Sequence, residues 1–113
     1  MSDVPDRYKE LLLKAIEAGE KRDYEKSTAI LLQLVAETDS IPEAFLYLGR
    51  SYHASGEYYN AVQAFKYYIS YRSNSAKGYF FLGRTYLVLG FFVKALKCFK
   101  NALDLSPKNP EIL

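Results

Sequence analysis

The chain has few residues able to bind a metal, form a disulfide or span a membrane. Its 113 residues include one cysteine and one histidine, so neither an internal disulfide nor a clustered zinc site can form. No apolar run approaches the roughly 18 residues that a membrane helix needs, and the first residues hold too many charges for a secretory signal. We therefore expect a soluble, cytoplasmic protein with no membrane segment, metal or cofactor.

Net charge is also small, at +2, and does not favour nucleic acid as the partner. The charges are unevenly distributed. Residues 1–41 carry six Lys and Arg against nine Asp and Glu, whereas residues 76–113 carry six against two. A basic strip of Lys94, Lys97 and Lys100 could contact RNA or an acidic surface. Because the many aromatic residues are explained as core, we favour a protein partner over nucleic acid.

Three segments repeat one pattern of small and aromatic residues with a period of thirty-four. The third copy has Leu82, Gly83, Tyr86, Gly90, Ala95 and Phe99, and the second has Leu48, Gly49, Tyr52, Gly56, Ala61 and Phe65. The first is a fainter copy with Ala15, Tyr24, Ser27 and Leu31. Small residues at fixed positions suit helices that approach closely, and the large ones fill the space around them.

Apolar spacing of three and four residues predicts two helices in each copy. Capping residues predict three of the helix starts: Asp3 ahead of a proline, Asp23, and Ser40 with Glu43 in the reciprocal S-x-x-E spacing.

Glycines and prolines predict where the helices turn or stop. Turns are expected at Gly56 and Gly90, and a stop at Pro107.

The pattern resembles the tetratricopeptide repeat family over most of the chain. The resemblance implies an all-α, right-handed superhelical solenoid of three antiparallel helix-pair repeats in a single domain. The repeats would be residues 8–41, 42–75 and 76–109, and residues 110–113 would begin a truncated following helix. The first helices of the pairs would line a concave face.

The resemblance also implies that a partner segment binds along this concave face. The residues expected there are Leu12, Ile16, Leu46, Arg50, His53, Lys77, Phe80, Arg84 and Leu87. Arg50 and Arg84 stand one repeat apart, and two aligned guanidinium groups suit a carboxylate or a phosphorylated side chain. Alternatively, these arginines are solvated or pair with an acid such as Glu43. For His53 we favour a polar position at the groove edge over a ligand or a base.

One binding mode of the family is not expected here. Members that clamp the C-terminal carboxylates of heat-shock chaperones use lysine, asparagine and arginine at five positions. The matching residues in this sequence are Leu12, Ile16, Tyr47, Lys77 and Phe81. Since only Lys77 agrees, we predict that the chain is not a chaperone carboxylate clamp.

No set of catalytic residues is present, and Cys98, beside Phe99 in the last helix, suits packing better than nucleophilic attack. We predict a non-enzymatic interaction module that acts as an adaptor or scaffold. Its partner would be a protein or peptide with apolar and acidic side chains, bound in the concave groove. The alternative is self-association, as a dimer or head to tail, because the end repeat lacks a polar shield and the acidic head could meet the basic tail.

Overall fold

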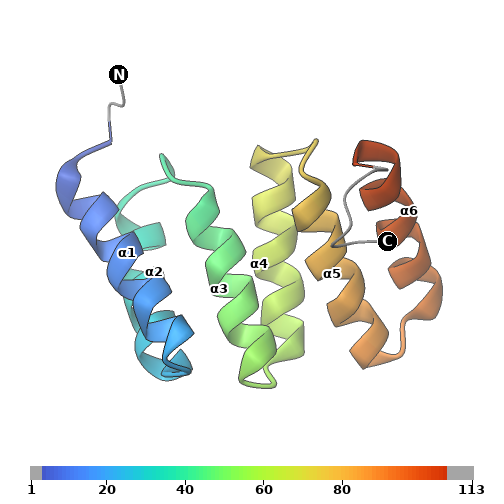
Figure 1. Cartoon of the computed structure of the whole chain (residues 1–113), viewed down its shortest axis with the longest axis horizontal. Helices are drawn as coiled ribbons and strands as arrows, with labels where there is room; N and C mark the ends of the chain where they lie inside the picture. Colours follow the sequence, from blue (N-terminus) through green and yellow to red (C-terminus); the bar gives the residue numbers. More distant parts are fainter. Residues whose placement is uncertain (1–3, 107–113) are drawn as a thin grey trace.

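The computed structural model describes residues 4–106, which form six α-helices and no strand (Figure 1). The helices are α1 (Asp6–Glu20), α2 (Tyr24–Glu37), α3 (Glu43–Ala54), α4 (Tyr58–Tyr71), α5 (Ala76–Leu89) and α6 (Phe92–Leu105). They pair as three hairpins, α1–α2, α3–α4 and α5–α6, and neighbouring hairpins meet where α2 packs on α3 and α4 packs on α5. The prediction of an all-α stack of helix pairs is confirmed.

The stack is curved, with the first helix of each pair on its inner side. Helix α3 touches both α1 and α5, whereas within residues 4–106 α2 does not reach α4 and α4 does not reach α6. The first helices are therefore closer together than the second helices. The surface formed by α1, α3 and α5 is accordingly the concave one.

Each hairpin closes through a residue in the left-handed region. Gly56 and Gly90 have φ of 83° and 85°, as the turn predictions require, and glycine adopts this conformation without a side-chain clash. The residue at the equivalent position of the first hairpin is Arg22, with φ of 63°. An L-residue with a side chain is disfavoured there by about 1–2 kcal/mol, so the first turn is the least favourable of the three.

Two of the helix starts have a side-chain cap. Asp23 Oδ1 accepts a hydrogen bond from the Lys26 backbone N–H at 3.2 Å, which confirms that prediction. Ser75 Oγ accepts from the Gly78 N–H at 3.1 Å, a cap that the sequence analysis did not single out.

The predicted cap formed by Ser40 and Glu43 is wrong. Helix α3 begins at Glu43, its N-cap residue is Pro42, and no side chain caps it. The Ser40 backbone N–H instead donates to Thr38 Oγ1 at 3.0 Å, which draws Ser40 into the preceding turn. Asp3, the stop at Pro107 and the further helix at 110–113 lie outside the described residues.

The glycines inside helices allow aromatic rings to approach the backbone. A Cβ on Gly49 would lie 2.5 Å from Cε1 of Phe65, whose side chain is fully buried. A Cβ on Gly83 would lie 2.8 Å from Cε1 of Phe99. In the first hairpin the corresponding residues are Ala15 and Leu31, both fully buried in one cluster. A small residue therefore faces a large one in every hairpin.

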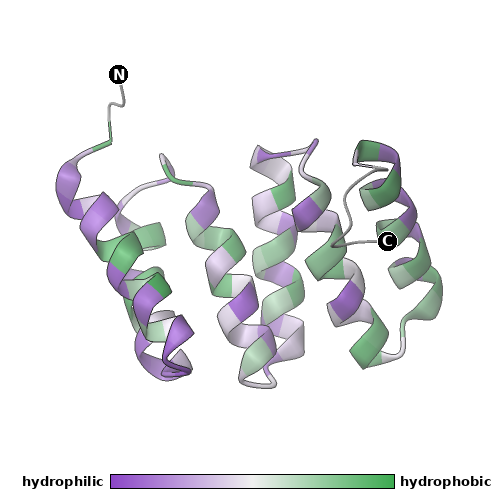
Figure 2. Ribbon diagram, in the orientation of Figure 1, coloured by the Kyte–Doolittle hydropathy of each residue, from purple (hydrophilic) through white to green (hydrophobic). Residues whose placement is uncertain are grey.

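The two ends of the stack differ in polarity. Hydrophilic residues cover much of α1, whereas α6 is largely hydrophobic (Figure 2). Phe92, Val93 and Leu96 on α6 are 66%, 70% and 69% exposed. No helix within residues 4–106 combines the length and the hydropathy that crossing a bilayer requires.

Candidate partner-binding groove

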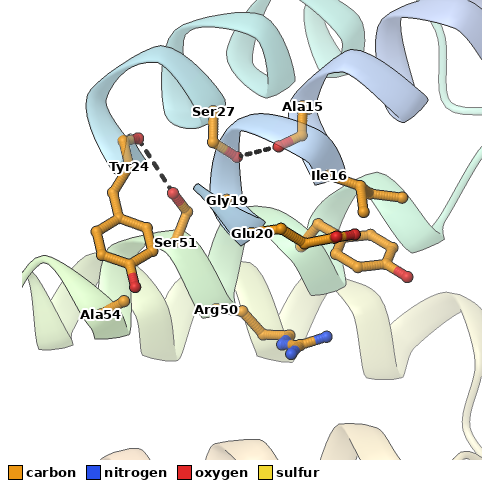
Figure 3. Close-up of a pocket in the computed structure, with 10 residues that line it drawn as sticks. Ala15, Ile16, Gly19, Glu20, Tyr24, Ser27, Arg50, Ser51 and Ala54 are labelled. Atoms are coloured by element: carbon orange, nitrogen blue, oxygen red, sulfur yellow. Dashed lines mark hydrogen bonds between the residues drawn. The ribbon is translucent and has the colours of Figure 1, made fainter. Parts of the chain in front are cut away.

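The concave side holds a hollow of about 350 Å³ between the first hairpin and α3 (Figure 3). It is lined by Ala15, Ile16, Gly19, Glu20, Tyr24, Ser27, Tyr47, Arg50, Ser51 and Ala54. Two serine hydroxyls in its wall are already occupied. Ser27 Oγ donates to the Ala15 carbonyl at 2.9 Å, and Ser51 Oγ donates to the Tyr24 carbonyl at 3.1 Å. The remaining lining is mostly apolar, apart from Glu20 and Arg50 at the edge.

A second hollow, of about 190 Å³, lies between α3 and α5. Its lining residues are Arg50, His53, Ala54, Phe65, Phe81 and Arg84. Arg50 and Ala54 line both hollows, so the two are adjacent. The two hollows lie side by side on the surface of α1, α3 and α5, with Arg50 and Ala54 in the wall that they share. We call this hollowed surface the concave groove.

Arg50 and Arg84 share one aromatic ring in the second hollow. The Arg50 guanidinium carbon lies 4.9 Å from the ring centroid of Phe81 and 5.6 Å from that of Tyr47. The Arg84 carbon lies 5.9 Å from Phe81 and 5.7 Å from Phe80. Stacking on a ring holds a guanidinium in place and leaves its N–H groups available to an anion.

Neither arginine forms an ion pair with the residues that the structure describes. The four ion pairs within residues 4–106 involve other groups. Glu43, the acid considered as an internal partner for these arginines, instead pairs with Arg72 Nε at 3.0 Å. Both arginine side chains are exposed on the groove side. Two positive charges that form no ion pair with the described residues therefore face the same hollow.

His53 is held in one orientation by a short hydrogen-bond chain. Its Nδ1 lies 2.9 Å from Thr85 Oγ1, and that hydroxyl donates to the Phe81 carbonyl at 3.0 Å. A hydroxyl has a single proton, so Thr85 must accept from His53, and Nδ1 carries the hydrogen. Burial lowers the pKa of His53, and the charge of Arg84 lowers it further. The imidazole is therefore neutral at pH 7, with its lone pair on Nε2.

The structure distributes the predicted groove residues unequally. Ile16, Arg50, His53 and Arg84 line the hollows. Phe80 contacts Arg84 without lining either hollow, while the exposed Lys77 and Leu87 lie on α5 outside both. Leu12 is half-buried against the first core cluster.

The placement of Leu46 in the groove is wrong. Its side chain is only 4% exposed and packs in the core cluster with Phe65, Tyr68 and Leu82. Leu46 corresponds to Phe80 one repeat later, which is half-buried. Helix α3 has a neighbouring first helix, α5, on its C-terminal side, whereas no described helix follows α5 on that side. Coverage by the next hairpin thus removes Leu46 from the surface.

The sequence analysis did not assign Phe81 or Tyr47 to the arginine site. A signal for them is present, because Tyr47 precedes Arg50 by three residues and Phe81 precedes Arg84 by three. An aromatic residue and an arginine at this spacing lie on the same side of a helix. The same pair recurs one repeat later.

The residues considered as metal ligands or as a nucleophile are placed as follows. Within residues 4–106 no group of three or more His, Cys, Asp and Glu residues is placed to hold a metal. The Cys98 thiol is buried, and burial raises its pKa, which disfavours the nucleophilic thiolate.

The curved stack and its groove define a helical-repeat solenoid. Residues 76–109 match the family model of the tetratricopeptide repeat. This match covers the third hairpin, and the described chain has the fold of the tetratricopeptide-repeat solenoids among the solved structures. No curated protein sequence matches the chain at a significant level.

Solved structures with the same fold cover almost the whole chain. One is the CopN–Scc3 complex, with a TM-score of 0.88 at 19% identity over 97% of this chain and 65% of that chain. Another is PcrH in complex with the chaperone binding region of PopB, with a TM-score of 0.88 at 21% identity over 99% and 89% of the two chains. A third is the first TPR of Spaghetti (RPAP3) bound to the HSP90 peptide SRMEEVD, with a TM-score of 0.88 at 17% identity over 95% and 85%. This chain thus spans less than two thirds of the CopN–Scc3 chain.

Proposed function

We propose that the chain is a non-enzymatic interaction module that binds an extended segment of a partner protein in the concave groove. The observation that carries this proposal is the adjacency of the two hollows, which share Arg50 and Ala54 in their lining. One hollow suits an apolar side chain and the other an acidic one. A segment that fills both would cross from α1 to α5 and would contact all three hairpins.

The first hollow suits an apolar side chain because its wall offers few unused polar groups. The hydroxyls of Ser27 and Ser51 already donate to backbone carbonyls, and Ser51 also contacts Thr28 Oγ1 at 3.0 Å. Within residues 4–106 no buried side-chain N or O atom lacks a hydrogen-bond partner. At about 350 Å³ the hollow falls within the usual range for ligand pockets. Burying an aliphatic or aromatic side chain there would supply about 25 cal/mol per Å² of apolar surface removed from water.

The second hollow suits an acidic side chain because of its charge. Arg50 and Arg84 bring two positive charges with no carboxylate paired to either one in the described residues. Hydrogen bonds between guanidinium and carboxylate are about twice as strong as neutral ones. The stacked rings keep both guanidinium groups oriented before binding, which reduces the entropy lost on association.

Two similar structures support a segment-binding role. PcrH is seen with the chaperone binding region of PopB, and the Spaghetti domain with an HSP90 peptide. The second of these modes is not proposed here, since Leu12, Ile16, Tyr47 and Phe81 stand where a carboxylate clamp needs polar or basic side chains. Recognition would instead depend on Arg50 and Arg84, which belong to a different row of the same face.

A peptide selection tests this proposal. A displayed library of random 15-residue peptides is selected against the wild-type chain, and the enriched peptides are then titrated by calorimetry. We expect an acidic residue and an apolar residue at a constant spacing. The double variant Arg50→Glu plus Arg84→Glu should weaken binding by at least about tenfold, because like charges repel the acidic residue. Ile16→Asp should weaken it independently through the first hollow.

The matched control is Lys66→Glu plus Lys100→Glu. These lysines are exposed, stand one repeat apart on α4 and α6, and lie outside the groove. Like the arginine variant, the control replaces two basic residues by two glutamates, so both variants change the net charge by the same amount. Equal weakening by both double variants would show a non-specific charge effect and would contradict the proposal. Failure to enrich any peptide family would contradict it as well.

A second candidate function, head-to-tail self-association, is favoured by the exposed face of α6. Leu96 is 69% exposed, whereas its equivalent one repeat earlier, Val62, is 7% exposed where α4 packs on α5. Helix α1 of a second copy carries the exposed residues Glu10 and Leu13, which could meet Lys97 and the neighbouring Leu96. Both apolar burial and charge complementarity would then contribute.

Light scattering distinguishes this candidate from a monomer. The wild-type mass should rise with concentration up to about 100 μM, and Leu96→Glu should abolish the increase. Leu32→Glu is the control, since Leu32 is also exposed but lies on α2. A constant monomer mass, or an equal effect of both substitutions, would exclude head-to-tail assembly through α6.

A further inference from the structure

The second hollow contains three nitrogen-bearing side chains on two helices. Arg50 and His53 lie on α3 and Arg84 on α5, and all three line the same space of about 190 Å³. The guanidinium carbons lie 4.9 Å and 5.9 Å from the same Phe81 centroid, so they are at most about 11 Å apart. Because both arginines line one hollow of about 190 Å³, an anion that enters it approaches both guanidinium groups.

The donors in this hollow match a phosphoryl group better than a carboxylate. Each guanidinium presents two or more N–H groups in a fixed plane, and a carboxylate has two oxygens. A phosphoryl group has three terminal oxygens and a charge of about −1.5 to −2 at pH 7. Two arginines at different angles suit three oxygens better than two, and clusters of arginine are a recurrent means of recognising phosphorylated side chains.

His53 adds a group whose role depends on a proton. Its Nδ1–H is committed to Thr85, so its free nitrogen, Nε2, is an acceptor while the ring is neutral. A fully ionised oxyanion brought against that lone pair would be repelled. If the ring takes up a proton at Nε2, it becomes a third donor to the same anion. The bound anion would also offset the charge of Arg84, which is one cause of the lowered pKa of His53.

The charged and titratable groups around His53 are few. Arg50 lies on the same helix, Arg84 faces it from α5, and the ring of Tyr58 on α4 meets it edge-on at 5.2 Å. No carboxylate of residues 4–106 is within ion-pair distance of the imidazole. Since both neighbouring charges are positive, the arrival of an anion is what would change the protonation of His53 most.

We propose that Arg50, Arg84 and His53 form a phosphoryl-binding site that takes a phosphorylated serine or threonine side chain and binds a proton at His53 Nε2 as it does so. This inference rests on the proposed function, since it names the anionic residue of the segment that the concave groove binds. Binding then depends on phosphorylation of the partner and strengthens as pH falls. Wherever the imidazole is neutral in the free chain and protonated in the complex, the uptake of one proton strengthens binding by up to about tenfold for each unit that the pH falls.

The test uses small probes, independently of any peptide. Phenyl phosphate, phenyl sulfate and N-acetyl-glutamate N-methylamide are titrated into the isotope-labelled chain at pH 6.5, 7.2 and 8. Because the protein has a single histidine, one imidazole signal in the NMR spectrum reports on His53. We expect phenyl phosphate to bind at least tenfold more tightly than the other two probes. We also expect it to raise the pKa of His53.

Three variants separate the contributions. Arg50→Gln plus Arg84→Gln should abolish phosphate binding, whereas Lys66→Gln plus Lys100→Gln, with the same change in net charge, should not. His53→Gln should retain binding at pH 8 but lose the increase at pH 6.5. This last variant keeps both arginines, so it isolates the proton-linked part of the proposal.

Each contrary result has a distinct meaning. If the glutamate probe binds as tightly as phenyl phosphate, the site is for carboxylates and the phosphoryl assignment is wrong. If phosphate binds without changing the titration of His53, the proton uptake is wrong. If no probe binds while selected peptides still require Arg50 and Arg84, this inference fails and the proposed groove function stands. If phosphate binds but no peptide family is enriched, the groove function fails and the anion site stands.

Discussion

Gly49 provides a direct test of how the hairpins are packed. Replacing it by alanine puts a Cβ 2.5, 2.6 and 2.8 Å from three carbons of the Phe65 ring. That ring is completely buried and must shift by about an ångström in a close-packed interior. Overpacking of this kind costs about 1–3 kcal/mol. Alanine at the same time gains about 1 kcal/mol in helix propensity over glycine.

Taking about 2 kcal/mol as the middle of that range for overpacking, the balance is a net loss of about 1 kcal/mol in the free energy of unfolding for Gly49→Ala. For a chain of this size that corresponds to a midpoint lower by about 4–8 °C. Circular dichroism during thermal and urea denaturation measures both quantities. Gly83→Ala should cost less, because the facing ring of Phe99 is only partly buried and has more room to move.

Gly19→Ala is the matched control. Gly19 is also helical, but its Cβ would meet only Ser27 Oγ at 3.7 Å, an ordinary contact. This substitution should stabilise the protein by up to about 1 kcal/mol. A Gly49→Ala protein as stable as the wild type, or a similar loss in Gly19→Ala, would refute the crowding explanation.

The first hairpin suggests a compensating change for Gly49→Ala. There alanine at position 15 faces leucine at position 31. Phe65→Leu should therefore recover part of the loss when combined with Gly49→Ala, with a coupling energy of about 0.5–3 kcal/mol in the double-mutant cycle. Strict additivity of the two substitutions would show that the Cβ added at position 49 does not clash with the ring of Phe65.

Three further predictions concern helix capping, pH and thiol chemistry. Ser75→Ala should lower the free energy of unfolding by about 1 kcal/mol in urea titrations, because its Oγ caps α5 by accepting from Gly78 N–H; an unchanged midpoint would contradict this. The lowered pKa of His53 means that the unfolded chain binds more protons below about pH 6.5. Acidification from pH 7 to pH 5 should therefore destabilise the wild type more than His53→Gln, and equal losses in the two would disprove the linkage. Cys98 should react with a thiol reagent on the order of tenfold more slowly in the folded chain than in urea, since burial raises its pKa; similar rates would show that the thiol is accessible.

Much of the architecture was predictable because its causes are periodic. A glycine facing an aromatic ring one helix away recurs every thirty-four residues, and so does the glycine turn. Such a pattern is visible without coordinates. The absence of a cap at Ser40 was not predictable in the same way, because its backbone N–H donates to Thr38 Oγ1 in a local turn that competes with the helix start.

The groove was predictable only in part, because its details depend on contacts between repeats. Spacing places Arg50 and Arg84 in one row, but the shared ring of Phe81 lies between two hairpins and depends on side-chain orientation. Leu46 has the spacing of a groove residue, yet the next hairpin covers it. Likewise, the bond from His53 to Thr85 joins residues far apart in sequence.

Arg22 introduces a difference between hairpins that are otherwise alike. Its backbone takes the left-handed form that Gly56 and Gly90 adopt freely. The unfavourable conformational energy of Arg22 therefore reduces the net stability that packing gives to the first hairpin. In a chain whose hairpins depend only on their neighbours, unravelling begins where local stability is lowest. Thermal opening should therefore start at the N-terminal end and reach the arginine pair between the second and third hairpins last. The hollow between α3 and α5 would then still be formed after the hollow beside α1 has opened.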